Sequence, residues 1–76
     1  GDHRKENVID YFMTCLPFRN NNTIFIFDDI HWSVDMEDAW KIIKKHPEVK
    51  VTIDLFQLGV VFFRTELSKQ DFVIKF

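Results

Sequence analysis

The sequence contains little glycine, proline or cysteine: two Gly, two Pro and one Cys in 76 residues. Two glycines cannot build the Gly-rich loop that cradles phosphates in nucleotide-binding motifs. One cysteine cannot form an internal disulfide, and because Cys15 lies in an apolar helical pattern we expect a buried free thiol. No segment approaches the about 20 apolar residues of a membrane span. The polar start, GDHRKEN, is unlike a signal peptide, so we expect a cytoplasmic protein.

An excess of charge of either sign is also missing. The net charge is −2, and acidic and basic residues are mixed along the chain, so the basic face of a nucleic-acid-binding protein is not expected. Aromatic residues, in contrast, are abundant: nine Phe, two Trp and one Tyr. This composition is too apolar for a disordered chain and indicates a real core. We therefore expect residues 1–76 to form a single small domain.

Two segments have the spacing of amphipathic helices. Residues 3–16 place apolar side chains at helical intervals, and Pro17 ends the pattern. Residues 34–46 follow Ser33, a good N-cap, with acidic residues in the first turns and lysines in the last. The expected buried stripes are, in the first helix, Val8, Ile9, Phe12, Met13, Cys15 and Leu16, and in the second, Met36, Ala39, Trp40 and Ile43.

Three further segments have the pattern of strands. Residues 23–28 contain an uninterrupted apolar run, 24–27, that ends at Asp28, and they predict a strand buried on both faces. Residues 49–55 alternate, with Thr52 and Asp54 on the polar side, which predicts an edge strand with one wet face. Residues 59–63 follow a short turn, so this strand should pair antiparallel with the previous one, and its two-sided apolarity favours insertion between the other two. The tail, residues 72–76, is a candidate last strand.

The order helix, strand, helix, strand, strand predicts an α/β fold, since a strand–helix–strand crossover leaves its two strands parallel. This order resembles the end of a class I S-adenosylmethionine-dependent methyltransferase of the O-methyltransferase type, a partial Rossmann-like sheet with its last main strand antiparallel. The segments that carry the resemblance are GDHRKENVIDYF, FIFDDIHW and VTIDLFQLGVVFF, and the order of elements extends the resemblance over essentially the whole chain. It implies that the chain is the C-terminal, substrate-side half of such an enzyme, without the Gly-rich cofactor-binding half.

The resemblance also implies functions for residues near the acidic pair. The enzyme would transfer a methyl group from S-adenosylmethionine to a small-molecule hydroxyl, and the fragment alone would be inactive. In metal-dependent members an Asp and an Asn at this strand end bind Mg²⁺; here Asp28 matches the Asp and Asp29 replaces the Asn. His3 is a candidate general base, and Asp28 a second catalytic candidate. His31 and Trp32 are candidates for lining a substrate pocket.

Each of these residues has a simpler alternative. One Asp of the pair can cap the following turn while the other is solvated. His3 can be a surface residue in the first turn of a helix, and Trp32 can pack the next helix against the sheet. The chain as a whole can be a non-catalytic α+β interaction module. In a doubly wound sheet cut before strand 23–28, as in the module, this strand would offer a bare edge, which predicts either a homodimer through that edge or a tail, FVIKF, folded over it.

Overall fold

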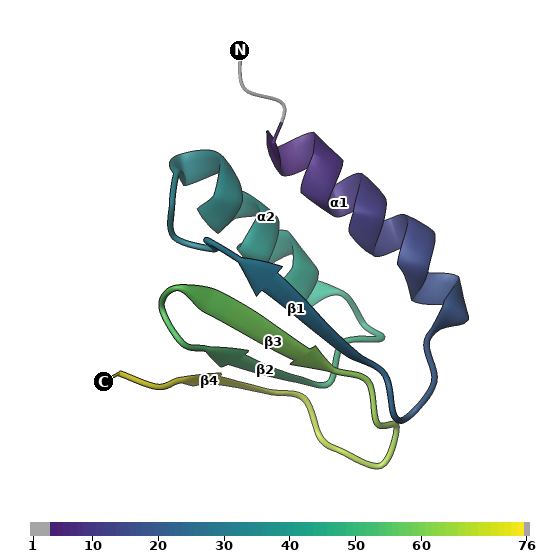
Figure 1. Cartoon of the computed structure of the whole chain (residues 1–76). Coiled ribbons are helices and arrows are strands. Elements are labelled where there is room, and N and C mark those ends of the chain that lie inside the picture. The colour runs from purple at the N-terminus through teal and green to yellow at the C-terminus, as the bar shows by residue number, and fades with distance from the viewer. Residues whose placement is uncertain (1–3, 76) are drawn as a thin grey trace.

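In the computed structural model, which describes residues 4–75, two helices pack on one face of a mixed β-sheet (Figure 1). The molecule measures 39 × 31 × 16 Å, and the short dimension accommodates one helical layer and one sheet. The described elements, in chain order, are α1 (Arg4–Cys15), the 3-10 turn η1 (Leu16–Phe18), β1 (Ile24–Asp28), α2 (Val34–Lys45), β2 (Val51–Asp54), β3 (Leu58–Phe62) and β4 (Gln70–Val73).

The sheet has the strand order β1-β3-β2-β4. β3 lies between β1 and β2 and is antiparallel to both, so β1 and β2 run parallel to each other. The predicted insertion of residues 59–63 is therefore confirmed. The small α/β fold with helices against a sheet is also as expected from the order of elements.

Helix α2 confirms its prediction closely. The Ser33 hydroxyl accepts a hydrogen bond from the Met36 backbone N–H at 3.2 Å, which caps the helix as expected. The four residues of the predicted stripe are all buried: Met36, Ala39, Trp40 and Ile43. The Trp40 ring lies directly over β3, where an added Cβ on Gly59 would come within 2.5 Å of it. The absence of a side chain at Gly59 is thus what lets α2 approach the sheet.

Helix α1 forms as predicted, but its buried face was predicted less accurately. Phe12 is buried, as is Leu16 in η1, and Phe12 makes edge contacts with Phe25 of β1. Met13 is half exposed, and Cys15 is exposed, so the expected buried thiol is wrong. Phe12 and Leu16 are four residues apart and define the helix face toward the sheet, while the flanking positions turn away from it.

The prediction for β2 was wrong in two respects. β2 is an inner strand, between β3 and β4. Its polar residues face the helices: Thr52 and Asp54 are opposite Val61 and Gly59 in the sheet register, and both are buried. They are tolerated there because each has a hydrogen-bonding partner, which removes most of the cost of burying a polar group.

The tail forms a strand, β4, but it does not lie against the edge of β1, where one of the two predictions placed it. β4 pairs with β2 in parallel, with Ile53 opposite Phe72. It therefore does not fold over β1, and that prediction is wrong. Within residues 4–75, β1 pairs on one side alone, with β3.

The second face of the sheet carries no helix of the described chain, so the prediction that residues 23–28 are buried on both faces is also wrong (Figure 1). Alternate residues of each strand point to this side, which we call the open face. Its apolar residues are Ile24, Ile26, Val51, Ile53, Leu58, Val60, Phe62 and Phe72, and its polar residues are Asp28 and Gln70; all are exposed or half-buried. Ile26 is 64 % exposed. No helix among residues 4–75 has the length and apolarity to cross a membrane.

Candidate functional site

The candidate site lies where the two parallel strands end. β1 ends at Asp28 and β2 at Asp54, and the parallel arrangement brings both ends to the same edge of the sheet. The loop after β1 and the turn after β2 are joined by a backbone hydrogen bond of 2.7 Å, from the Asp29 N–H to the Gln57 carbonyl. Ligands of α/β proteins commonly bind beyond the carboxyl ends of strands, which makes this edge the first place to look for chemistry.

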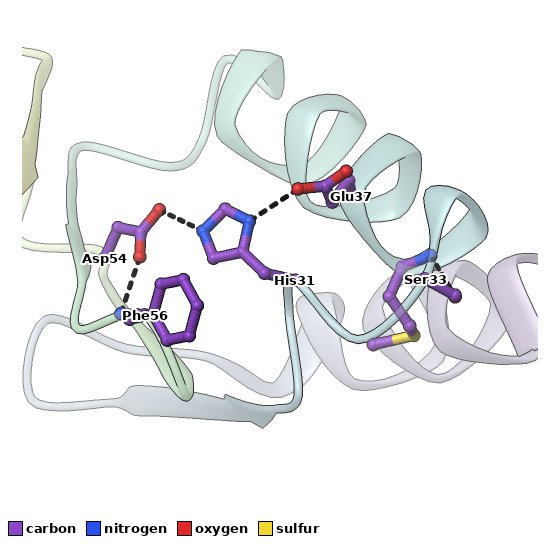
Figure 2. Close-up of polar contacts among 6 residues, drawn as sticks. His31, Ser33, Glu37, Asp54 and Phe56 are labelled. Carbon is purple, nitrogen blue, oxygen red and sulfur yellow. Dashed lines mark hydrogen bonds and ion pairs between the residues drawn. The ribbon is translucent and has the colours of Figure 1, made fainter.

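His31 is held in this loop between two carboxylates (Figure 2). Its Nδ1 lies 2.9 Å from Oε2 of Glu37, and its Nε2 lies 2.6 Å from Oδ2 of Asp54. The neighbouring Ile30 is buried in the core and anchors the loop. The Ser33 cap begins α2 so that Glu37 falls in its first turns, within reach of the imidazole.

The two carboxylates differ in how firmly they are fixed. Asp54 is buried, and its second oxygen, Oδ1, accepts a hydrogen bond of 2.8 Å from the Phe56 backbone N–H. Its side chain is 10 % exposed, compared with 45 % for Glu37. Asp54 is therefore a fixed acceptor that orients the His31 ring, while Glu37 can move into solvent at small cost.

The carboxylates also set the charge of His31. The hydrogen bond to Glu37 has the largest effect and raises the pKa of His31 above its usual 6.5, and the hydrogen bond to Asp54 acts in the same direction. Partial burial opposes both by disfavouring the imidazolium, but the net pKa shift is upward. Both hydrogen bonds therefore stabilise the imidazolium form, which can donate to both carboxylates.

A pocket of about 270 Å³ opens beside His31. It is lined by Asp29, His31, Trp32, Phe56 and Gln57. The Phe56 ring stacks on the His31 ring with centroids 5.5 Å apart. Trp32 and Phe56 are 71 % and 70 % exposed, so both rings are accessible from solvent.

A second pocket of about 660 Å³ shares two of these residues, Phe56 and Gln57. Its other lining residues are Leu55, Leu58 and Lys75. Phe56 therefore lies between two hollows on the same edge of the sheet.

The backbone is strained at two positions of this edge. Asp29 has φ 59° and Phe56 has φ 70°, the positive φ values recorded for non-glycine residues among residues 4–75. Asp tolerates this region better than a bulky aromatic residue does. Strain of this kind persists where surrounding contacts impose it and clusters at functional sites. Here the Asp54 carboxylate, through the Phe56 N–H, contributes to holding the strained turn.

The predicted site residues are only partly brought together. Asp29, His31 and Trp32 line the small pocket, whereas Asp28 is exposed on the open face and is not among its lining residues. His3 lies outside the described residues. Among residues 4–75 there is no group of three or more His, Cys, Asp or Glu side chains that could hold a metal ion. Mg²⁺ binding by Asp28 and Asp29 therefore stays a prediction.

Three residues of the site were not found from the sequence: Glu37, Asp54 and Phe56. Glu37 appeared to be one more acidic residue in the first turns of a helix, and Asp54 one more polar residue on a wet face. Their contact with His31 spans 6 and 23 residues along the chain. A signal for Asp54 was present, since an Asp lies at or next to the end of each predicted parallel strand: Asp28 in residues 23–28 and Asp54 in residues 49–55.

Comparison with known proteins gave no match: no family model, no curated protein and no solved structure is significantly similar to this chain.

Proposed function

We propose that this chain is the C-terminal, substrate-side part of an S-adenosylmethionine-dependent methyltransferase that acts on a small-molecule hydroxyl. The observation that carries the proposal is the reversed strand β3 between the parallel strands β1 and β2. This arrangement, preceded by a helix before each parallel strand, is the one that the resemblance to the methyltransferase terminus implies. It is more specific than an α/β composition alone.

The uncovered surfaces of the sheet support the same proposal. A doubly wound sheet has helices on both faces. Here one face is covered, the open face is mostly apolar, and one edge of β1 pairs with no strand among residues 4–75. The remaining half of a methyltransferase domain would add a strand beside β1 and helices on the open face, which removes both exposed features together.

The residues of this chain would serve the substrate side of the cleft. S-adenosylmethionine would supply the methyl group, and binding it would depend on the Gly-rich loop, for which the two glycines here do not suffice. Of the Mg²⁺ candidates, Asp28 points to the open face and Asp29 to the pocket, so the described residues do not form a metal site by themselves. His3 remains a candidate base.

The test is a calorimetric titration of S-adenosylhomocysteine into the natural protein extended upstream of Gly1. Saturable binding with one site per chain is the expected result. The 76-residue chain serves as the matched control and should show no binding. Absence of binding to an extended protein that circular dichroism shows to be folded would overturn the proposal.

The second candidate is an interaction module that pairs through the edge of β1 with a second copy of itself. The observation that favours it is an apolar groove of about 280 Å³ between α1 and this edge. The groove is lined by Tyr11, Phe12, Cys15, Ile24, Phe25, Ile26 and Phe27. A strand added there would satisfy the free backbone groups of β1.

Sedimentation equilibrium and hydrogen exchange of the 76-residue chain distinguish the two candidates. A dimer whose β1 amides are protected from exchange supports the module. A monomer with rapid exchange of residues 24–28 contradicts pairing through this edge, and a dimer that is lost in the extended protein would favour the methyltransferase.

A further inference from the structure

The small pocket beside His31 is built by two turns that are tied together. The first is closed by a hydrogen bond of 2.9 Å from the Trp32 backbone N–H to the Asp29 carbonyl, so the two side chains leave opposite ends of one turn. The facing turn supplies Phe56 and Gln57, and the Asp29 N–H donates to the Gln57 carbonyl at 2.7 Å. One carboxylate and two aromatic rings are therefore presented to the same hollow by a braced backbone.

The charges around this pocket favour a cation over an anion. Of the described residues that line it, Asp29 carries a carboxylate and His31 is the one that can be positive. His31 is itself held by two further carboxylates, those of Glu37 and Asp54. The group of one imidazole and three carboxylates is thus net negative whether or not the ring is protonated. Lys75 lines the neighbouring larger hollow instead of this one.

The lining residues match an organic cation better than a metal ion. Mg²⁺ and Ca²⁺ take about six to eight oxygen ligands, whereas this pocket offers a single carboxylate, that of Asp29. Cations that carry alkyl groups bind instead against aromatic rings, Trp being the strongest of them. Trp32 and Phe56 supply rings that are largely accessible, and Phe56 is held in place by stacking on His31 (Figure 2).

We propose that the pocket lined by Asp29, Trp32 and Phe56 binds a small organic cation with an alkylated ammonium head, of the choline type. Asp29 supplies the opposite charge, Trp32 the principal aromatic contact and Phe56 an apolar wall. The volume of about 270 Å³ lies below the usual range for drug-sized ligands and suits such a head group. Binding of the cation is independent of the proposed function, because it requires nothing from the cofactor-binding half.

The test compares two probes that differ in charge and share one shape. Neohexanol is the uncharged isostere of choline, with a carbon atom in place of the quaternary nitrogen. Each is titrated into the 76-residue chain and followed by the indole N–H signals in NMR, with sodium chloride at matched concentration as the reference. We expect saturable binding of choline that shifts Trp32 and leaves the buried Trp40 unshifted. Neohexanol should bind at least about fivefold more weakly, since the ring and the carboxylate both attract the charge.

Two matched pairs of variants assign the site to its residues. Asp29→Asn removes the charge and keeps a residue type that tolerates positive φ, so the loop should be retained and choline should bind about fivefold more weakly. Asp28→Asn is its control: it removes the same charge from the open face and should weaken binding less.

The second pair concerns the aromatic ring. Trp32→Leu keeps an apolar side chain without the ring, so choline should bind about threefold more weakly while neohexanol is unaffected. The shifts are then followed on the Gln57 backbone amide, which lies in the facing turn. Phe18→Leu is the control, because Phe18 is an exposed aromatic residue outside the pocket lining, and it should bind choline as the wild type does.

Three outcomes would overturn the proposal. They are no saturable shift of Trp32 in the folded chain, equal binding of choline and neohexanol, which indicates apolar contact alone, and equal losses in Asp28→Asn and Asp29→Asn, which indicates the general negative field of this edge. The first two use the wild type and hold even if a variant fails to fold. Choline binding without S-adenosylhomocysteine binding to the extended protein leaves the cation site and removes the methyltransferase, and the reverse result removes the cation site alone.

Discussion

The two faces of the sheet are built from similar strands and have opposite environments. The face toward α1 and α2 holds Val61 at 0 % exposure and a fully satisfied pair of polar residues, Thr52 and Asp54. The open face holds more uniformly apolar side chains, and Ile26 is 64 % exposed. The more apolar face is thus the less buried one. Hydrophobicity alone does not decide which face the chain covers; helix placement and available hydrogen-bond partners do.

Removing the largest ring of the covered face should have the greatest effect. Trp40→Ala leaves a cavity between α2 and β3 and is expected to lower the free energy of unfolding by about 4 kcal/mol. The measurement is urea denaturation followed by circular dichroism. Trp32→Ala, an exposed aromatic substitution, is the control and should change stability by less than about 0.5 kcal/mol. Equal losses in the two variants would contradict the assignment of the core.

Adding one methyl group under the same ring should cost slightly less. In Gly59→Ala the new Cβ would lie 2.5 Å from the Trp40 ring, so α2 must shift outward. We expect a loss of about 3 kcal/mol on denaturation, at the upper end of overpacking effects. The double variant with Trp40→Leu should recover part of the loss, because the smaller side chain vacates the space. A Gly59→Ala variant with wild-type stability would show that α2 lies farther from β3.

The hydrogen bonds of His31 to Glu37 and Asp54 should make stability depend on pH. Because the folded-state pKa of His31 is raised, its contribution is fully present below 6.5 and is lost as the pH rises through the folded pKa. The difference in unfolding free energy between the wild type and His31→Gln should therefore shrink over that range. His46→Gln is the control that assigns the effect to His31. A difference that is constant with pH would mean that the carboxylates do not hold His31.

The smallest expected effect is on the open face. Ile26→Lys should change the unfolding free energy of the monomeric 76-residue chain by about 0.5 kcal/mol or less, since the side chain is already in water. In the extended protein the same substitution should be clearly destabilising, as it would place a charge under a covering layer. Denaturation of both proteins checks this. A loss above about 2 kcal/mol in the short chain would show that the open face is covered there too.

Much of the fold was predictable because its signals are local. The Ser33 cap and the stripe of α2 depend on residues within four positions of each other, and the short turn before β3 required antiparallel pairing. The two-sided apolarity of β3 was enough to predict its inner position. Which face of α1 turns toward the sheet was harder to predict. Met13 and Cys15 are apolar and flank Phe12 and Leu16, but they do not face the sheet.

The errors concern contacts between residues distant in sequence. Thr52 is buried because it donates a 2.5 Å hydrogen bond to Asp71 of β4, and Asp54 because it accepts from His31 when that ring is protonated at Nε2. Neither partner is visible in the alternation of residues 49–55, which therefore suggested a wet face. The candidate site was predicted only in part, for the same reason. His31 and Trp32 follow an acidic strand end and could be found from the sequence, but the partners of His31 come from two other elements.

The inner position of β3 also sets the order in which the chain can assemble. β1 is synthesised early, yet its pairing residues are 30 to 38 positions later, from Asp28 with Leu58 to Ile24 with Phe62. β2 and β3 are joined by a short turn, so that hairpin closes with little loss of chain entropy. On a ribosome, β1 therefore cannot pair with β3 until residues 58–62 have emerged.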